Sequence, residues 1–132
     1  MVGSHLIKAW SSTQASVALS SGEAEYYGLV RGVGVGLGIQ SLYRDIGLPL
    51  KLRAWTDSSA AMGIAKRQGL GKFGHLQCQS LWLQQRLRRG EFVLHKVAGE
   101  VNPADMFTKY LTHAEIERHC SRLGIKVSLR TR

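Results

Sequence analysis

The stretch of sequence that decides the fold is Lys51-Leu-Arg-Ala-Trp-Thr-Asp-Ser-Ser59. Its first six residues predict a β-strand that ends at Asp57. Residues 58–67 follow directly and predict a helix that stops near Gly69 and Gly71. A strand followed at once by a helix indicates an α/β unit, in which the helix packs on the sheet that the strand joins.

Upstream of this unit the sequence predicts a hairpin and then a long helix. The runs His5–Trp10 and Gln14–Leu19 are short and partly alternating, and the Ser-Ser-Thr segment between them indicates a turn. Ser20 and Ser21 offer N-cap chemistry, so a helix is expected from about Gly22 to Asp45. Glycines weaken a helix, and we expect those inside this one to permit close packing on a sheet rather than to form a dinucleotide-binding loop. They are Gly28, Gly32, Gly34, Gly36 and Gly38.

Downstream, helices and one more strand alternate. A helix is predicted from residue 74 or 75 to residue 89, and a strand with alternating side chains from 91 to 97. After a loop at 98–101, Pro103 opens a short helix that reaches about Tyr110, and Thr112 caps a last helix to about Leu123. This order predicts the α/β class, with a mixed sheet flanked by helices.

The composition indicates a globular chain with an anionic partner. At 132 residues the chain can form one core, and we expect one domain over residues 1–123 and a basic tail over 124–132. Lys and Arg number 18 against nine Asp and Glu, which gives a net charge of +9. This excess favours nucleic acid or another polyanion as the partner; the alternative is that the charge serves only solubility.

The cysteines and the hydropathy pattern indicate the cellular compartment in which the protein is expected. Cys78 and Cys120 lie far apart and predict no disulfide framework, and the neighbouring His75 and His119 do not complete a zinc pattern. No apolar run approaches the roughly 20 residues that span a bilayer. Residues 1–5 show no signal-peptide pattern. We therefore expect an intracellular protein with no membrane partner.

Three acidic residues lie where secondary structure is predicted to begin or change. Glu25 is in the first turns of the long helix, Asp57 ends a strand, and Asp105 follows Asn102 by three positions. Each has an ordinary explanation. Glu25, or Glu23 in its place, would complement the helix dipole. Asp57 and Asp105 would cap the helices that follow them, the second through a box closed by Asn102.

Taken together, the three acids indicate a metal site. The strand end at Asp57 and the start of the Asp105 helix can meet at one sheet edge. Carboxylates that gather there repel one another unless cations bind them. Oxygen-only ligation suits Mg²⁺ or Mn²⁺ rather than zinc. Two such ions can activate a water molecule and stabilise the leaving oxygen of a phosphodiester.

The acids belong to three motifs in a fixed order, Ser20-Ser-Gly-Glu-Ala-Glu-Tyr26, Thr56-Asp-Ser-Ser-Ala60 and Asn102-Pro-Ala-Asp-Met-Phe-Thr-Lys109. With the elements between them, they resemble the ribonuclease H domain at the end of the polyprotein of copia-type long-terminal-repeat retrotransposons, from about His5 to Leu111. The resemblance implies a ribonuclease H-like fold and cleavage of the RNA strand of RNA–DNA hybrids by two metal ions. It implies that Glu25, Asp57 and Asp105 hold those ions. It also implies the reverse transcriptase part of the same polyprotein as a partner, in a cytoplasmic particle or the nucleus.

The sequence departs from the family pattern in two places. The family has a fourth acid on an opening strand upstream of the hairpin, whereas Met1 to Ser4 contain none. The resemblance therefore implies a domain truncated at its N-terminus, and we expect the isolated chain to be catalytically weak or inactive. The alternatives are a non-catalytic nucleic-acid-binding remnant of the same fold, or a chain whose open sheet edge accepts a partner's strand. Near His75, relatives usually show Lys-His followed by an aliphatic residue and an acid, and here the segment is Gly74-His-Leu-Gln77.

Basic residues at helix ends are candidates for contacts with phosphate groups, although they would also complement helix dipoles. Serines near the acidic motifs are candidates for contacts with the 2′-hydroxyl groups of a hybrid. The tryptophans Trp10, Trp55 and Trp82 are predicted to be core or half-buried residues rather than stacking platforms. The basic candidates are Lys66, Arg67, Lys72, Arg86, Arg88 and Arg89, and the serine candidates are Ser20, Ser21 and Ser58.

Overall fold

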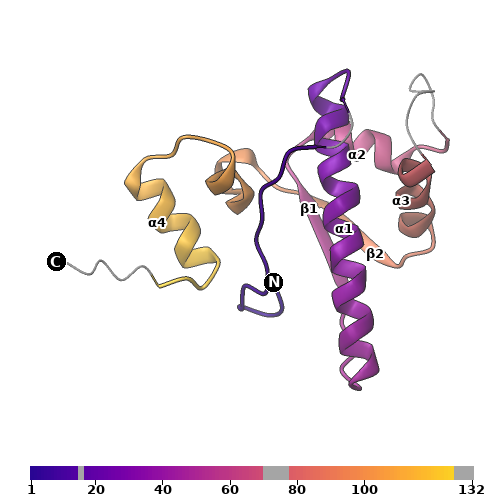
Figure 1. The fold of residues 1–132 in the computed structure, drawn as a ribbon, viewed down its shortest axis with the longest axis horizontal. Coiled ribbons are helices and arrows are strands. Elements are labelled where there is room, and N and C mark those ends of the chain that lie inside the picture. The colour runs from indigo at the N-terminus through magenta and orange to yellow at the C-terminus, as the bar shows by residue number, and fades with distance from the viewer. Residues whose placement is uncertain (15–16, 70–77, 127–132) are drawn as a thin grey trace. The chain divides into compact units, whose positions relative to one another are not determined.

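A computed structural model of the chain describes residues 1–14, 17–69 and 78–126 (Figure 1). The chain divides into two compact units, Gln14–Val97 and Met1–Thr13 with Ala98–Arg132. The elements, in chain order, are α1 (Ser21–Asp45), β1 (Leu52–Thr56), α2 (Ser59–Lys66), α3 (Cys78–Arg88), β2 (Phe92–Lys96), η1 (Gly99–Val101), η2 (Pro103–Phe107) and α4 (His113–Arg122).

The unit Gln14–Val97 is an α/β arrangement, as predicted. The predicted mixed sheet is not found: in the described residues the sheet has two strands, which run parallel, with Leu52 opposite Phe92 and Thr56 opposite Lys96. The ladder continues past β2, because the backbone N–H of Val97 donates to the carbonyl of Thr56 at 3.0 Å. Parallel strands need a long crossover between them, and α2 and α3 form it here. The predicted strands and the helices around them are thus confirmed to within a few residues in the described part of the chain.

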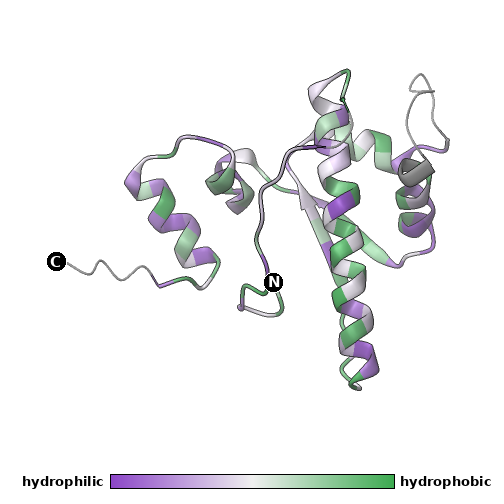
Figure 2. Ribbon diagram, viewed as in Figure 1, coloured by the Kyte–Doolittle hydropathy of each residue, from purple (hydrophilic) through white to green (hydrophobic). Residues whose placement is uncertain are grey.

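The core of this unit lies between one face of the sheet and the three helices. From α1 it takes Tyr26, Leu29 and Val33, which recur at helical spacing. Phe92 and Leu94 face them from β2. Figure 2 shows hydrophobic residues interrupted by hydrophilic ones along α1, as expected for a helix with one buried face. The remaining buried members are Ala61, Ile64, Ala65 and Leu83. Each large apolar side chain buried in this way stabilises the fold by about 1.5–3 kcal/mol.

The glycines of α1 have two different roles. A Cβ at Gly36 would lie 2.7 Å from Cδ1 of Leu52 on β1, so here the predicted close packing on the sheet is confirmed. A Cβ at Gly28, Gly32 or Gly38 would meet nothing within 4 Å, so for these three the prediction is wrong. They lie on the exposed side of the helix. The Gly-rich run is helical throughout, as expected, and forms no strand-to-helix turn.

A buried amide ties α3 to the end of α2. Nε2 of Gln84 donates to the carbonyls of Ile64 and Gly69, both at 3.0 Å. Gln84 is fully buried, and its Oε1 has no hydrogen-bond partner among the described residues. The bond to Ile64 satisfies a carbonyl that the end of α2 leaves without a helical partner, and the bond to Gly69 fixes the segment after the helix.

The predicted hairpin is wrong. Residues 5–14 and 17–19 contain no strand, and the nearest pairing is an isolated bridge between Val2 and His5. A two-stranded hairpin is marginal in water unless a third strand or a helix covers its apolar face. Here Val17 and Leu19 are exposed. The backbone N–H of Leu19 donates to the carboxylate of Glu23 rather than to a strand.

The second unit is built from short elements. Thr112 and Glu115 form a capping box at the start of α4, which confirms the predicted cap. The hydrogen bonds from Thr112 lower the pKa of the Glu115 carboxyl. The guanidinium of Arg122 donates to the carbonyl of Val101 at 2.8 Å and ties α4 to η1. The helix predicted to reach Tyr110 is a 3₁₀ helix that ends at Phe107.

None of the helices in the described part of the chain is long and apolar enough to cross a membrane. The predicted boundary between a domain at 1–123 and a tail at 124–132 stays a prediction, and residues 127–132 lie outside the described part.

Candidate functional site

At the start of α1 the two acids of the first motif, Glu23 and Glu25, have different environments. Glu23 is fully buried, and its carboxylate accepts from the N–H of Leu19 at 2.8 Å and from the Tyr27 hydroxyl at 3.2 Å. The N–H of Glu23 donates to Oγ of Ser20, the N-cap, at 3.2 Å. Burial and the bond to Glu23 raise the pKa of Tyr27. Glu23 therefore has the structural role that one of the two acids was expected to have. The Ser-x-x-Glu spacing from Ser20 is the sequence signal for it.

Glu25, by contrast, is exposed on the second turn of α1. It lies three positions after Gly22 and so on the same side of the helix. A Cβ at Gly22 would lie 2.5 Å from Cβ of Ala60, so this side of α1 meets the first turn of α2. Glu25 therefore lies one helical turn from the contact between the two helix starts.

Asp57 follows β1 directly and is half-buried. It was a candidate cap for the next helix, but the cap is Ser58, whose Oγ accepts from the N–H of Ala61 at 3.1 Å. The N–H of Ser58 donates to Oγ1 of Thr56 at 3.2 Å. Within the described residues, the Asp57 carboxylate makes neither a hydrogen bond nor an ion pair. The capping explanation of Asp57 is wrong, and its oxygens have no structural partner there.

Glu25 and Asp57 lie at the same end of the unit. Gly22 meets Ala60, and Gly36 meets Leu52, so α1 runs antiparallel to β1. The start of α1 is consequently level with the carboxyl end of the strand, beside α2 in Figure 1. In α/β sheets with parallel strands, ligands bind at this edge.

The carboxyl edge of the sheet also has a cation, Lys96, that is not among the basic residues predicted from the sequence. Lys96 is the last residue of β2, opposite Thr56, and its Nζ donates to Oγ of Ser59. The end of a parallel strand next to the Asp57 strand is the signal that would have found it.

Asp105 belongs to the other compact unit, where it lies in η2. Its carboxylate is 14% exposed and accepts from Nζ of Lys109 at 2.9 Å. Asn102 caps η2 by itself, through Oδ1 and the N–H of Ala104 at 3.2 Å. The box expected between Asn102 and Asp105 is therefore wrong, because Asp105 is engaged one turn further along the chain.

The basic candidates differ in their exposure and in their contacts with other side chains. Arg86 forms an ion pair with Glu91 and lies over the Trp82 ring, 5.5 Å from its centroid. Arg67 is close enough to Tyr26 to lower its pKa, although burial prevails and raises it to about 12. Lys66 and the arginines at the end of α3 are exposed, namely Arg88 and Arg89. Lys72 and His75 lie outside the described residues.

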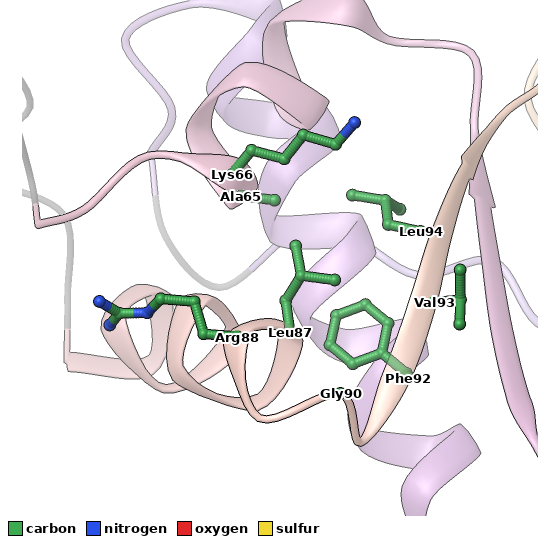
Figure 3. Close-up of a pocket in the computed structure, with 8 residues that line it drawn as sticks. All are labelled: Ala65, Lys66, Leu87, Arg88, Gly90, Phe92, Val93 and Leu94. Atoms are coloured by element: carbon green, nitrogen blue, oxygen red, sulfur yellow. The ribbon is translucent and has the colours of Figure 1, made fainter.

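Lys66 and Arg88 border an open pocket of about 460 Å³. Figure 3 shows Leu87, Phe92 and Leu94 directed toward its middle, with the side chain of Arg88 extending away from them. The pocket is lined mainly by apolar atoms, so it can accept a small apolar group. It contains none of the three predicted acids.

The serine and tryptophan candidates also have defined places. Ser20 and Ser58 are helix caps, and Ser21 is the exposed first residue of α1. Trp82 is half-buried, as predicted. Trp55 is not, because it lies on the sheet face that the helices leave uncovered, where 57% of it is exposed. Trp10 is 37% exposed, with Nζ of Lys8 5.4 Å from its ring centroid.

Among residues 1–14, 17–69 and 78–126, no three His, Cys, Asp or Glu side chains form a group that could hold a metal ion. Glu25 and Asp57 do supply two carboxylates at one edge of the sheet, and carboxylate oxygens are the donors that Mg²⁺ and Mn²⁺ prefer. Comparison of the chain with protein-family models, with curated proteins and with solved structures found no match.

Proposed function

We propose that the chain is a ribonuclease H-like domain that hydrolyses the RNA strand of RNA–DNA hybrids with Mg²⁺ or Mn²⁺, with weak activity in the isolated chain. The observation that carries this proposal is the pair of acids at the carboxyl edge of the parallel sheet. Asp57 has no structural partner in the described part of the chain, and Glu25 is exposed one turn from the contact between α1 and α2. The motif resemblance adds Asp105 to the set.

The different environments of Glu23 and Glu25 support the assignment of Glu25 as a metal ligand. A carboxylate that stabilises a helix start is buried and bonded locally, and Glu23 meets that description. At the second motif Ser58 caps α2, so the neighbouring acid, Asp57, is not needed as the cap. In the second motif Ser58 has the structural role, so the carboxylate of Asp57 is available for a ligand.

In the proposed site the acids hold cations and the basic residues hold the substrate. When bound, the metal ions would supply the charge that activates water and stabilises the leaving oxygen of a phosphodiester. Asp57 directly follows β1 and precedes Ser58, whose N–H donates to Oγ1 of Thr56, so the backbone of Asp57 is held on both sides. Lys96 at the same edge, and Lys66, Arg88 and Arg89 at the helix ends, would contact phosphate groups without reading sequence.

The fold supports the proposal at a coarser level. A long helix antiparallel to a strand, with two helices in the crossover to a parallel strand, is compatible with the ribonuclease H-like architecture that the motifs imply. The excess of basic residues favours a polyanionic substrate.

The experiment compares Asp57→Asn with Asp45→Asn. Asp45 is an exposed acid at the other end of α1, so its variant makes the same change of charge away from the proposed site. Mg²⁺ and Mn²⁺ binding is measured by calorimetry, and cleavage of a fluorescent RNA–DNA hybrid is followed in both metals. We expect Asp57→Asn to weaken metal binding and to abolish whatever cleavage the parent shows, while Asp45→Asn matches the parent. Equal metal binding by all three proteins would refute the proposal.

A second candidate function is hybrid binding without chemistry, which the net charge of +9 favours. It predicts that hybrid affinity is the same in the parent and in Asp57→Asn, and that Mg²⁺ has the same small effect on both. The two functions therefore differ in whether the metal response depends on Asp57.

A further inference from the structure

One face of the two-stranded sheet is not covered by α1, α2 and α3, the helices of the same compact unit. Arg53 and Trp55 on β1 alternate with the partly buried Leu52 and Ala54. Opposite them on β2 lie Val93, 51% exposed, and His95. We call these four residues, Arg53, Trp55, Val93 and His95, the outer sheet face. Parallel sheets are ordinarily covered on both sides, so a tryptophan exposed here indicates a surface that binds something.

The aromatic residues of the outer sheet face form a stacked pair. Trp55 and His95 are direct neighbours in the strand register. Their ring centroids are 4.5 Å apart and the ring planes differ by 26°. Because each ring limits the movement of the other, little conformational entropy remains to be lost when a third planar group joins the stack.

The charge of this surface favours an anion. Neither β1 nor β2 contains an acidic residue. Arg53 precedes Trp55 by two positions on the same face and is exposed, and Lys51 is exposed just before the strand. A planar stack with cations beside it and no acid within either strand complements an unpaired base with its phosphates, and an acidic peptide would leave the stack unused.

We propose that the outer sheet face binds single-stranded nucleic acid, with a base stacked on Trp55 and a neighbouring phosphate contacting Arg53. The proposal does not rest on the proposed metal ligands, since Arg53 and Trp55 lie within β1, whereas Asp57 follows that strand and Glu25 lies on α1. It therefore goes beyond hybrid cleavage, and it persists if the metal site fails.

The test is fluorescence anisotropy with a labelled 12-nucleotide oligouridine and an abasic strand of the same length and charge. Base–aromatic stacking is worth about 1–3 kcal/mol, so Trp55→Ala should weaken oligouridine binding roughly 5- to 150-fold. Trp55→Phe should retain most of the affinity. Trp10→Ala is the matched control, because Trp10 is also exposed and close to a cation, and it should bind like the parent.

The abasic strand separates stacking from charge. We expect it to bind the parent as weakly as oligouridine binds Trp55→Ala, and to bind both proteins equally. Trp55→Ala should weaken oligouridine binding by the same factor in the Asp57→Asn background as in the parent, which distinguishes this site from the proposed metal site.

Three outcomes would overturn the proposal. The first is equal oligouridine affinity in the parent and in Trp55→Ala. The second is equal affinity of the parent for the abasic strand and oligouridine, because binding would then be electrostatic alone. The third is a dimer in sedimentation that Trp55→Ala converts to a monomer, because a second copy of the chain would then cover the outer sheet face. Near-UV circular dichroism of each variant checks that the fold is retained.

Discussion

The contact between Gly22 and Ala60 is predicted to hold α1 against α2, and with it Glu25 near the end of β1. A Cβ at Gly22 would lie 2.5 Å from Cβ of Ala60 and 3.8 Å from its Cα. Ordinary van der Waals contacts of a Cβ atom lie at 3.4–4 Å, so Gly22→Ala requires the two helix starts to separate by about 1 Å to reach that range. Ala60 has no rotamer that could move away, and the backbone must yield instead.

The size of the effect follows from two opposing terms. Inserting a methyl group into a close contact costs about 1–3 kcal/mol. Replacing glycine by alanine in a helix gains up to about 1 kcal/mol, and less at the second helical residue, where Gly22 lies. We therefore expect Gly22→Ala to lower the free energy of unfolding by about 1–2 kcal/mol.

Gly28→Ala is the control, because a Cβ there would meet nothing within 4 Å. The same replacement at this interior, exposed position should raise the free energy of unfolding by about 0.5–1 kcal/mol. The double variant Gly22→Ala/Ala60→Gly should recover most of the loss, since it returns a methyl group's space to the contact.

Urea unfolding followed by far-UV circular dichroism measures all four proteins. If Gly22→Ala is as stable as Gly28→Ala, α1 and α2 are not in close contact. The placement of Glu25 beside the end of β1 would then be wrong as well.

Three further predictions concern contacts inside each unit. Gln84→Ala should destabilise the protein by about 1–3 kcal/mol in urea unfolding, because the buried carbonyl of Ile64 and the partly buried carbonyl of Gly69 lose their donor. Thr112→Ala should weaken α4 by about 1 kcal/mol through loss of the N-cap, seen as faster amide exchange in that helix alone. Burial raises the pKa of Tyr26 from 10.0 to about 12, so the unfolded state loses this proton first as the pH rises. Stability should therefore fall between pH 10 and 12, by at most about 3 kcal/mol, and Tyr26→Phe should flatten that part of the profile in thermal melts.

The elements that the sequence predicted well carry local signals. Ser20 and Thr112 are caps followed by an acid three positions later, and both helices begin where those signals lie. The hairpin failed because alternation over a short run says nothing about whether a third strand or a helix will cover it. The side chains of Val17 and Leu19 remain exposed, and the backbone of Leu19 bonds to Glu23.

The candidate site was predictable in part for the same reason. The positions of Glu25 and Asp57 at the ends of elements are local properties, and the structure brings both to one end of the unit Gln14–Val97. That Glu23 is buried while Glu25 is exposed depends on which side of α1 faces the core. The exposure of Trp55 depends on which sheet face the helices cover, and its strand alone does not determine that.

The central proposal is that Glu25 and Asp57 bind divalent cations at the carboxyl edge of the sheet. The most direct test adds a small fraction of an equivalent of Mn²⁺ to ¹⁵N-labelled protein and follows the amide signals, because the paramagnetic ion broadens only nearby groups. We predict that the amides of these two residues lose intensity together, while those of the exposed acids Asp45 and Glu117 do not, and that Asp57→Asn removes the effect. Broadening that spares Glu25 and Asp57, or that is spread evenly over all exposed acids, would contradict the proposal.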